Sequence, residues 1–292
     1  MTAGLATRPA ATVAPGALRA LAVLEARRYL RSPLFLAGLG VLVWSTVVAT
    51  GDFRHNAASE DPGDLVLLPA FFLGLLGVVV AYRMTRTLDA SGEAPDAAPS
   101  DRFRRTAALC LACLVPAVPA FAWIGWIYVA LAVGRIPLSS AITPGARAAI
   151  LLSGAVCAVG GPLFGVLVAR WARFPGAGLT AVVVLAGWAL LATVSLALPP
   201  SRAGTLLHLS APFTGWVSAD GPRRPAWVAG GSPGWYLAYL VLLCGLAVTA
   251  ALLPGTTGPR RRRVLQVLGA LAVVAIGCLG LAVLPDPARV PL

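Results

Sequence analysis

The chain has 292 residues, of which 58% are hydrophobic and only 12% charged, and its mean hydropathy is +0.83. A water-soluble domain carries about 25% charged residues, so this composition excludes one large water-soluble fold and indicates a membrane protein. The formal net charge is +12, and all 23 basic residues are arginine. Because the sequence has no lysine, it excludes a P-loop lysine, a lysine Schiff base and a Ser-x-x-Lys nucleophile.

The N-terminal region divides into a tail and a helix. Residues 1–16 are rich in Ala, Thr and Pro, which predicts a disordered tail. Residues 17–31 have a helical pattern that separates apolar from basic side chains. We expect this amphipathic helix to lie in the membrane interface, with Arg27, Arg28 and Arg31 directed toward anionic headgroups. The alternative is an ordinary basic flank of the first span.

Seven apolar segments are long enough to cross a membrane, since a span of about 30 Å takes roughly 20 helical residues. They are residues 32–51, 65–82, 106–134, 148–169, 174–198, 235–253 and 264–284. The sequence therefore predicts an all-α integral membrane protein, a polytopic bundle of about seven transmembrane helices. We expect Pro116 and Pro119 to bend the third span and Pro162 to bend the fourth.

The distribution of arginine predicts the orientation of the chain. With the N-terminus inside, 16 arginines fall in inside segments and 7 in outside segments, as the positive-inside rule requires. Seven spans then bring the C-terminus outside. The net positive charge is explained by topology, so we expect no nucleic acid partner. An all-arginine composition is typical of a GC-rich bacterial genome, and we expect the chain in a bacterial cytoplasmic membrane.

Two of the predicted loops carry unusual compositions. Residues 83–105, predicted to lie inside, mix both signs of charge, which suits either a solvated connector or a docking surface for a cytoplasmic partner. Residues 199–234, predicted to lie outside, are poor in charge but hold many large apolar side chains. We expect a re-entrant or interfacial hairpin there, with tryptophans at headgroup depth. An ordinary loop folded over the helix ends is the alternative.

Few residues in the sequence offer chemistry. The predicted spans contain no Asp, Glu, Arg or His, which argues against ion-coupled transport. His55 and His208 both fall in predicted outside loops, and the single C-x-x-C motif has no second pair, so we expect no catalytic, cofactor or metal site. Gly161 and Gly165 form a G-x-x-x-G motif in the fourth span, suited to close packing within the chain or across a dimer.

Three stretches carry a resemblance to a known family. Residues 24–33, Leu-Glu-Ala-Arg-Arg-Tyr-Leu-Arg-Ser-Pro, resemble the E-x-R-x-x-x-R-(N/S)-P sequence before the first span of type-2 ABC exporter membrane subunits, the ABC-2 permeases. Residues 89–93 with 99–102 are similar to the family's acidic stretch and P-x-S-R turn, and residues 209–213 to its L-S-P-F element. The likeness covers about residues 17–255.

The resemblance implies a fold and a function. It implies an interface helix at 17–31, a six-span domain over 32–255, a coupling helix after the second span and a re-entrant hairpin at 199–234. Residues 264–284 are then an additional span. Under this reading the loop that couples to the ATPase includes Arg83, Arg86, Asp89, Glu93, Asp101 and Arg102.

The implied activity is transport and not catalysis by this chain. A permease subunit would form a homo- or heterodimer and export an amphiphilic small molecule, lipid or peptide. A separate ATPase chain would bind the ATP. The alternative is a non-transporting membrane scaffold or an immunity protein that binds a partner.

Overall fold

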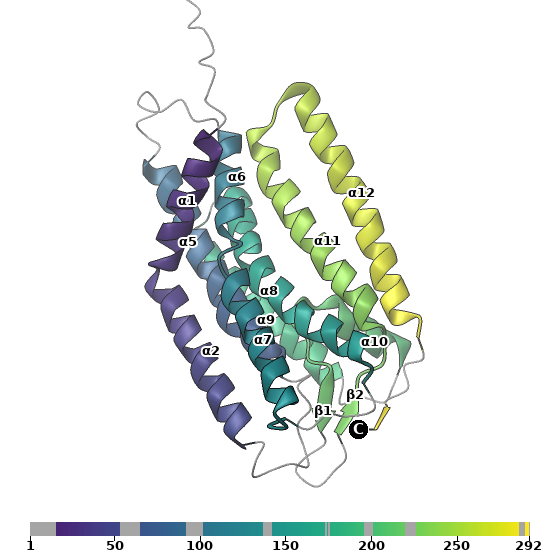
Figure 1. Cartoon of the computed structure of the whole chain (residues 1–292). Coiled ribbons are helices and arrows are strands. Elements are labelled where there is room, and N and C mark those ends of the chain that lie inside the picture. Colours follow the sequence, from purple (N-terminus) through teal and green to yellow (C-terminus); the bar gives the residue numbers. More distant parts are fainter. Residues whose placement is uncertain are drawn as a thin grey trace, which may run out of the picture.

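Seven helical segments of the computed structural model are long and apolar enough to cross a membrane, and they lie side by side in one bundle (Figure 1). The structure describes residues 16–52, 65–91, 102–136, 142–172, 174, 176–195, 201–219, 226–285 and 290–291. The predicted tail falls on residues 1–16, of which the structure describes Gly16 alone. The predicted all-α, seven-span membrane architecture is confirmed.

The first half of the chain contributes four spans. Its elements are α1 (Ala17–Leu30), α2 (Pro33–Asp52), α4 (Leu67–Pro69), the π-helix η1 (Ala70–Leu75), α5 (Leu76–Ser91), α6 (Arg102–Ala112), α7 (Ala117–Ala132) and α8 (Pro144–Trp171). The second span is the continuous run α4–η1–α5, and the third is α6 followed by α7.

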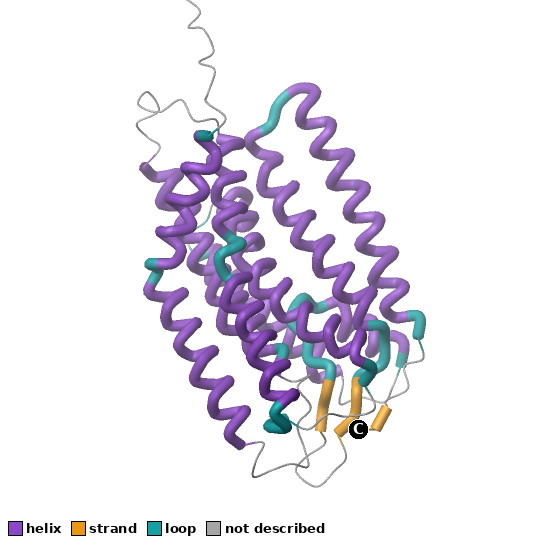
Figure 2. Tube along the Cα trace, in the orientation of Figure 1, coloured by secondary structure: helices purple, strands orange, loops and turns teal. Residues whose placement is uncertain are grey.

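The second half contributes three spans and a small sheet. Its elements are α9 (Ala177–Ser195), α10 (Arg202–Ser210), β1 (Val217–Ala219), β2 (Ala226–Val228), α11 (Pro233–Leu252), the 3₁₀ turn η2 (Leu253–Gly255), α12 (Gly258–Val283) and β3 (Val290–Pro291). The strands pair antiparallel in the order β1-β2-β3, with Ser218 opposite Trp227 and Val228 opposite Val290. Figure 2 shows this sheet and the C-terminus at the end of the bundle opposite to the start of α1.

The third span is interrupted, as its prolines predict. Between α6 and α7 the backbone makes short-range bonds in place of the α-helical pattern, such as Leu114 N to Leu111 O at 3.1 Å and Val115 N to Ala112 O at 3.1 Å. Pro116 has no N–H to continue an α-helix and disfavours helical geometry in the residue before it. In contrast, α8 passes through Pro162 without ending.

The centre of the bundle is the contact between α8 and the second span. Two thirds (67%) of the α8 window is buried, against 11% for α12. Glycines let the two backbones meet: a Cβ atom at Gly154 would lie 2.7 Å from the carbonyl oxygen of Val66. A Cβ atom at Gly161 or Gly165 would overlap the carbonyl oxygen of Gly74 or Val78 respectively. The face of the G-x-x-x-G motif is therefore covered by the chain's own second span.

Helix α2 also packs closely against the second span through a glycine, on the side away from α8. A Cβ atom at Gly38 of α2 would overlap the carbonyl oxygen of Phe72, which lies in η1. The π-helical turn thus lies between two glycine contacts, one from α2 and one from α8. A π-turn widens the helix locally and shifts the register of the carbonyls that follow. Because the π-helical turn lies between these two contacts, we infer that it adjusts the second span to the close approach of α2 and α8.

We predict that Gly161→Ala destabilises the protein by about 1–3 kcal/mol, because the new methyl group has no space between α8 and the second span. Gly187→Ala in α9 is the matched control, since nothing lies within 4 Å of a Cβ atom there. Alanine favours helices over glycine by about 1 kcal/mol, so the control variant is expected to be neutral or more stable. The apparent melting temperature in detergent measures both, and equal values for the two variants would contradict the packing argument.

Candidate functional site

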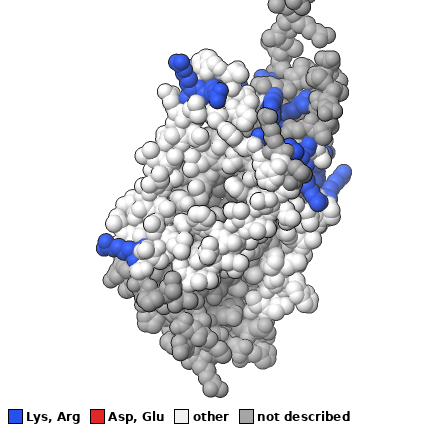
Figure 3. All heavy atoms as spheres, turned by 180° about the vertical axis from the view of Figure 1, so that it is seen from behind, with Lys and Arg blue, Asp and Glu red and all other residues white. Residues whose placement is uncertain are grey.

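Arginine side chains gather at one end of the bundle. Of the 17 arginines that the structure describes, 14 lie where α1 runs, α5 ends, α6 begins, α8 ends and α12 begins, and we call this the arginine end. The other three are Arg135, Arg147 and Arg202, at the opposite end. Figure 3 shows the clustering on one face, and the described residues in the middle of that face form an uncharged band. Such a band between unequal charged ends fits a helical membrane protein.

Helix α1 packs along α6 and buries two of its residues, Glu25 and Tyr29. Arg27 and Arg31 are exposed. The Glu25 carboxylate accepts hydrogen bonds from Arg28 Nη1 at 3.3 Å to each oxygen. Because the side chain of Glu25 is only 6% exposed, this partner offsets the loss of water around its charge.

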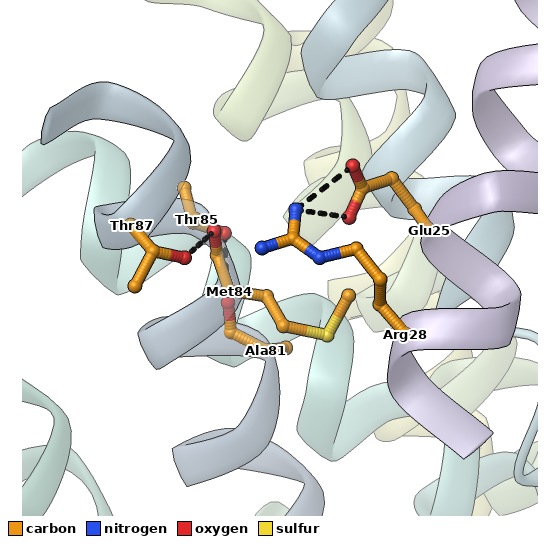
Figure 4. Close-up of polar contacts among 6 residues, drawn as sticks. All are labelled: Glu25, Arg28, Ala81, Met84, Thr85 and Thr87. Atoms are coloured by element: carbon orange, nitrogen blue, oxygen red, sulfur yellow. Dashed lines mark hydrogen bonds and ion pairs between the residues drawn. The ribbon is translucent and has the colours of Figure 1, made fainter. Parts of the chain in front are cut away.

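Arg28 also extends toward the second span. In Figure 4 its side chain reaches from α1 toward the α5 residues Met84 and Thr85. The Thr85 hydroxyl donates to Ala81 O at 2.8 Å, so it is satisfied within its own helix. The Glu25–Arg28 pair therefore lies close to the place where α1 meets α5.

Tyr29 connects α1 to the central helix contact. Its side chain is 1% exposed and its ring meets Phe35 edge-on, with centroids 5.2 Å apart. A Cβ atom at Gly77 would lie 2.8 Å from Tyr29 Oη and 2.9 Å from Pro162 Cδ. The phenol hydroxyl thus reaches the α5 backbone at the position where the α8 proline packs. This side chain therefore brings α1 into the region where α5 and α8 pack together.

The predicted coupling residues fall at the arginine end where the structure describes them. Arg83 is exposed and Arg86 half-buried on α5, and Arg102 is exposed at the start of α6. Asp89 belongs to α5, with a side chain outside the described part. Glu93 and Asp101 lie outside the described residues. The ends of α5 and α6 that bound this loop lie beside α1.

The turn between α11 and α12 also belongs to the arginine end. The Arg260 guanidinium lies 3.7 Å from the centroid of the Phe103 ring, a cation–π contact that joins α12 to α6. A Cβ atom at Gly255 would lie 3.2 Å from the backbone nitrogen of Phe103. Both contacts hold the α11–α12 turn against the start of the third span.

The fourth span is longer than the sequence predicts, and this corrects the expectation that the spans lack ionisable groups. Helix α8 begins at Pro144 and ends at Trp171, so it includes Arg147 and Arg170, each only 7% exposed. Arg147 Nη2 donates to Ile142 O at 3.4 Å. Both arginines are near the helix ends. The sequence prediction missed them because hydropathy locates an apolar centre better than a helix boundary.

The segment after α9 folds as a helix and a strand hairpin, and its one histidine is buried. His208 was expected in an outside loop, but it lies in α10 and is 1% exposed. The Ser201 side chain caps this helix by accepting a hydrogen bond from Gly204 N at 3.0 Å. A serine before a short apolar run is the signal that predicts such a helix start.

His208 belongs to a network of polar and aromatic side chains. Its Nδ1 lies 3.3 Å from Ala192 O and its Nε2 lies 3.1 Å from the Thr214 hydroxyl. Since a carbonyl only accepts, a neutral ring donates from Nδ1 and accepts at Nε2. Trp216 packs edge-on between His208 and Tyr236, and the Tyr236 hydroxyl donates to Ala211 O at 2.8 Å. The network anchors the segment after α10 on α11.

Burial lowers the pKa of His208 from 6.5 to about 4, although hydrogen bonds with the backbone of Ala192 and Gly215 partly oppose the shift. A lowered pKa means that the unfolded chain binds more protons than the folded one between pH 6.5 and 4. The resulting stability is fully present above pH 6.5 and is lost as the pH falls through about 4.

We predict that apparent stability falls with acidification by up to about 1.4 kcal/mol per pH unit below pH 6.5. His208→Asn removes the titrating group but keeps an N–H donor, so its melting temperature is expected to depend less on pH. Melting in detergent from pH 7.5 to 4.5 compares the two proteins. If the melting temperatures of the wild type and the variant fall equally with pH, groups other than His208 cause the acid sensitivity.

The chain matches no family model, no curated protein and no solved structure.

Proposed function

We propose that the chain is the membrane subunit of an ABC-type exporter that works with a separate ATPase. The observation that carries the proposal is the arrangement of α1, the end of α5 and the start of α6 at the arginine end. Together these elements offer a polar surface next to a helix that contacts the core through Tyr29. The resemblance of residues 24–33 to the ABC-2 permeases supports the same assignment.

In this proposal the ATPase docks on the loop between α5 and α6 and on the exposed arginines of α1. Arg83 and Arg102 are at the two ends of the loop, and Arg27 and Arg31 are on the neighbouring helix. Closure of the ATPase on ATP would push α1 and the loop. Tyr29 would pass the movement to α5, because its buried side chain brings the hydroxyl to Gly77, beside the place where Pro162 of α8 packs.

The ionisable groups of the central span bear on whether an ion gradient or a nucleotide drives the proposed transport. Between Arg147 and Arg170, α8 has no carboxylate, basic side chain or histidine, so it offers no group that would couple transport to protons or ions. The sequence has no lysine for a phosphate-binding loop of its own. Nucleotide bound by a partner chain is the energy source that fits. An amphiphilic small molecule, a lipid or a peptide is the substrate class that we propose.

We predict that the protein, purified from its native host in mild detergent, retains an ATP-binding protein that hydrolyses ATP. Scrambling residues 89–101 is expected to abolish this association without loss of the folded permease. Scrambling the short outside segment 53–64 is the matched control. A pure preparation that contains no ATPase, from wild type and control alike, would favour the scaffold or immunity-protein alternative and contradict this proposal.

We also propose that the arginine end faces the cytoplasm and the C-terminus the outside. In a variant without native cysteines, Ala288→Cys is expected to react with an impermeant maleimide in intact cells. Thr257→Cys, in the turn between α11 and α12, is expected to react only after permeabilisation. The opposite pattern would reverse the orientation, and labelling of both from one side would contradict a membrane crossing by α12.

A further inference from the structure

An apolar cavity of about 360 Å³ lies between four helices in the second half of the chain. Gly160 and Gly161 of α8, Leu185 of α9, and Leu243 of α11 line it, and Leu268 contributes from α12. Phe213, in the segment after α10, lines it as well. A Cβ atom at Gly160 would lie 3.2 Å from Cys244 Sγ of α11, so this glycine keeps the side of α8 that faces α11 free of a side chain.

The cavity lies at the depth of the hydrocarbon core. Gly161 and Leu243 are close to the midpoints of their helices, which are both transmembrane segments. The polar groups near it are already used: the Cys157 thiol donates to Pro212 O. A polar solute would lose its hydrogen bonds with water there and gain none. The lining therefore suits a hydrocarbon chain.

The cavity extends toward the arginine end. Ala250 lines it near the C-terminal end of α11, and the indole N–H of Trp171 donates to Ala250 O at 2.9 Å. Trp171 is 56% exposed, which suits a tryptophan at the level of lipid headgroups. The cavity thus begins close to the membrane surface and continues inward.

A run of arginines begins α12, one to two turns before the cavity residue Leu268. Residues 260–263 are all exposed at the start of α12, and Arg261 precedes Leu268 of the cavity by seven residues, which is two turns on the same helix face and a rise of about 10.5 Å. Arg260 is engaged on Phe103. Among the described carboxylates, Glu25 pairs with Arg28, so no described acid neutralises Arg261, Arg262 or Arg263. The N–H groups of the first turn of α12 add positive potential.

We propose that α8, α11 and α12 hold one anionic phospholipid, with its phosphate beside Arg261 in the positive field of Arg262 and Arg263, and with one acyl chain in the cavity. Charge complementarity selects the headgroup, and the apolar lining below it selects the chain. A free phosphate would leave the cavity empty, and a helix from a second copy is too wide to enter it. The site needs neither transport nor the ATPase, and it gives the additional helix α12 a role.

The test uses the full-length protein reconstituted in phosphatidylcholine vesicles. A small fraction of phosphatidylglycerol with a photoreactive acyl chain is added, and adducts are located by mass spectrometry. We expect adducts concentrated around Ala250 and Leu268. The same photoreactive chain on phosphatidylcholine is expected to label these positions much more weakly, because it lacks the net negative charge.

Variants separate the headgroup from the chain. Changing Arg261, Arg262 and Arg263 together to Gln is expected to reduce labelling by about fivefold per arginine. The same change at Arg19, Arg135 and Arg202, which are exposed and lie away from the start of α12, removes equal charge and is expected to leave labelling unchanged. Ala250→Phe narrows the cavity and is expected to abolish labelling of Leu268, while gel filtration shows that the variant is folded.

Three results would overturn the proposal. The first is equal labelling by the two lipids. The second is labelling spread over the exposed faces of α2 and α9, as expected for boundary lipid. The third is an Ala250→Phe variant that is folded and labelled like the wild type, since the chain would then lie outside the cavity.

Discussion

The close backbone contact between α8 and the second span is the constraint on which the rest of this structure depends. Without water to drive helices together in a bilayer, association relies on close packing, and only glycine lets two backbones approach this far. Gly154, Gly161 and Gly165 fix α8 against the run from α4 to α5. The π-helical turn at Ala70–Leu75 lies within the same contact. Helices α2, α6, α7, α9 and α11 all contact one or both members of this pair.

The arginine end is built on that contact. Tyr29 of α1 reaches Gly77 and Pro162 at the meeting point of α5 and α8, so the surface helix is tied directly to the core. In the neighbouring ion pair, Arg28 neutralises the buried carboxylate of Glu25, which is itself a residue of α1. The proposed docking of an ATPase rests on this connection between a polar surface and the core.

At the end opposite the arginines, buried hydrogen bonds stabilise the structure, whereas the peripheral helix α12 is only loosely packed. The segment after α9 is held by a buried network around His208, in which the satisfied polar groups allow a neutral histidine to lie in an apolar setting. In contrast, α12 has little buried surface and meets the bundle mainly through α11. The apolar cavity lies beside it, and its first residues carry the longest run of arginine in the chain, with Arg261 two turns before the cavity residue Leu268.

The sequence alone determined the number of spans, their approximate positions and the asymmetry of arginine, because hydropathy and charge act locally and need no partner. It also located Gly161 and Gly165 as packing residues, although only the structure decided that their partners are Gly74 and Val78 of the same chain. The burial of His208, the π-helical turn and the cavity beside α12 came from tertiary structure. Each depends on which helices become neighbours, and residues distant in sequence decide that.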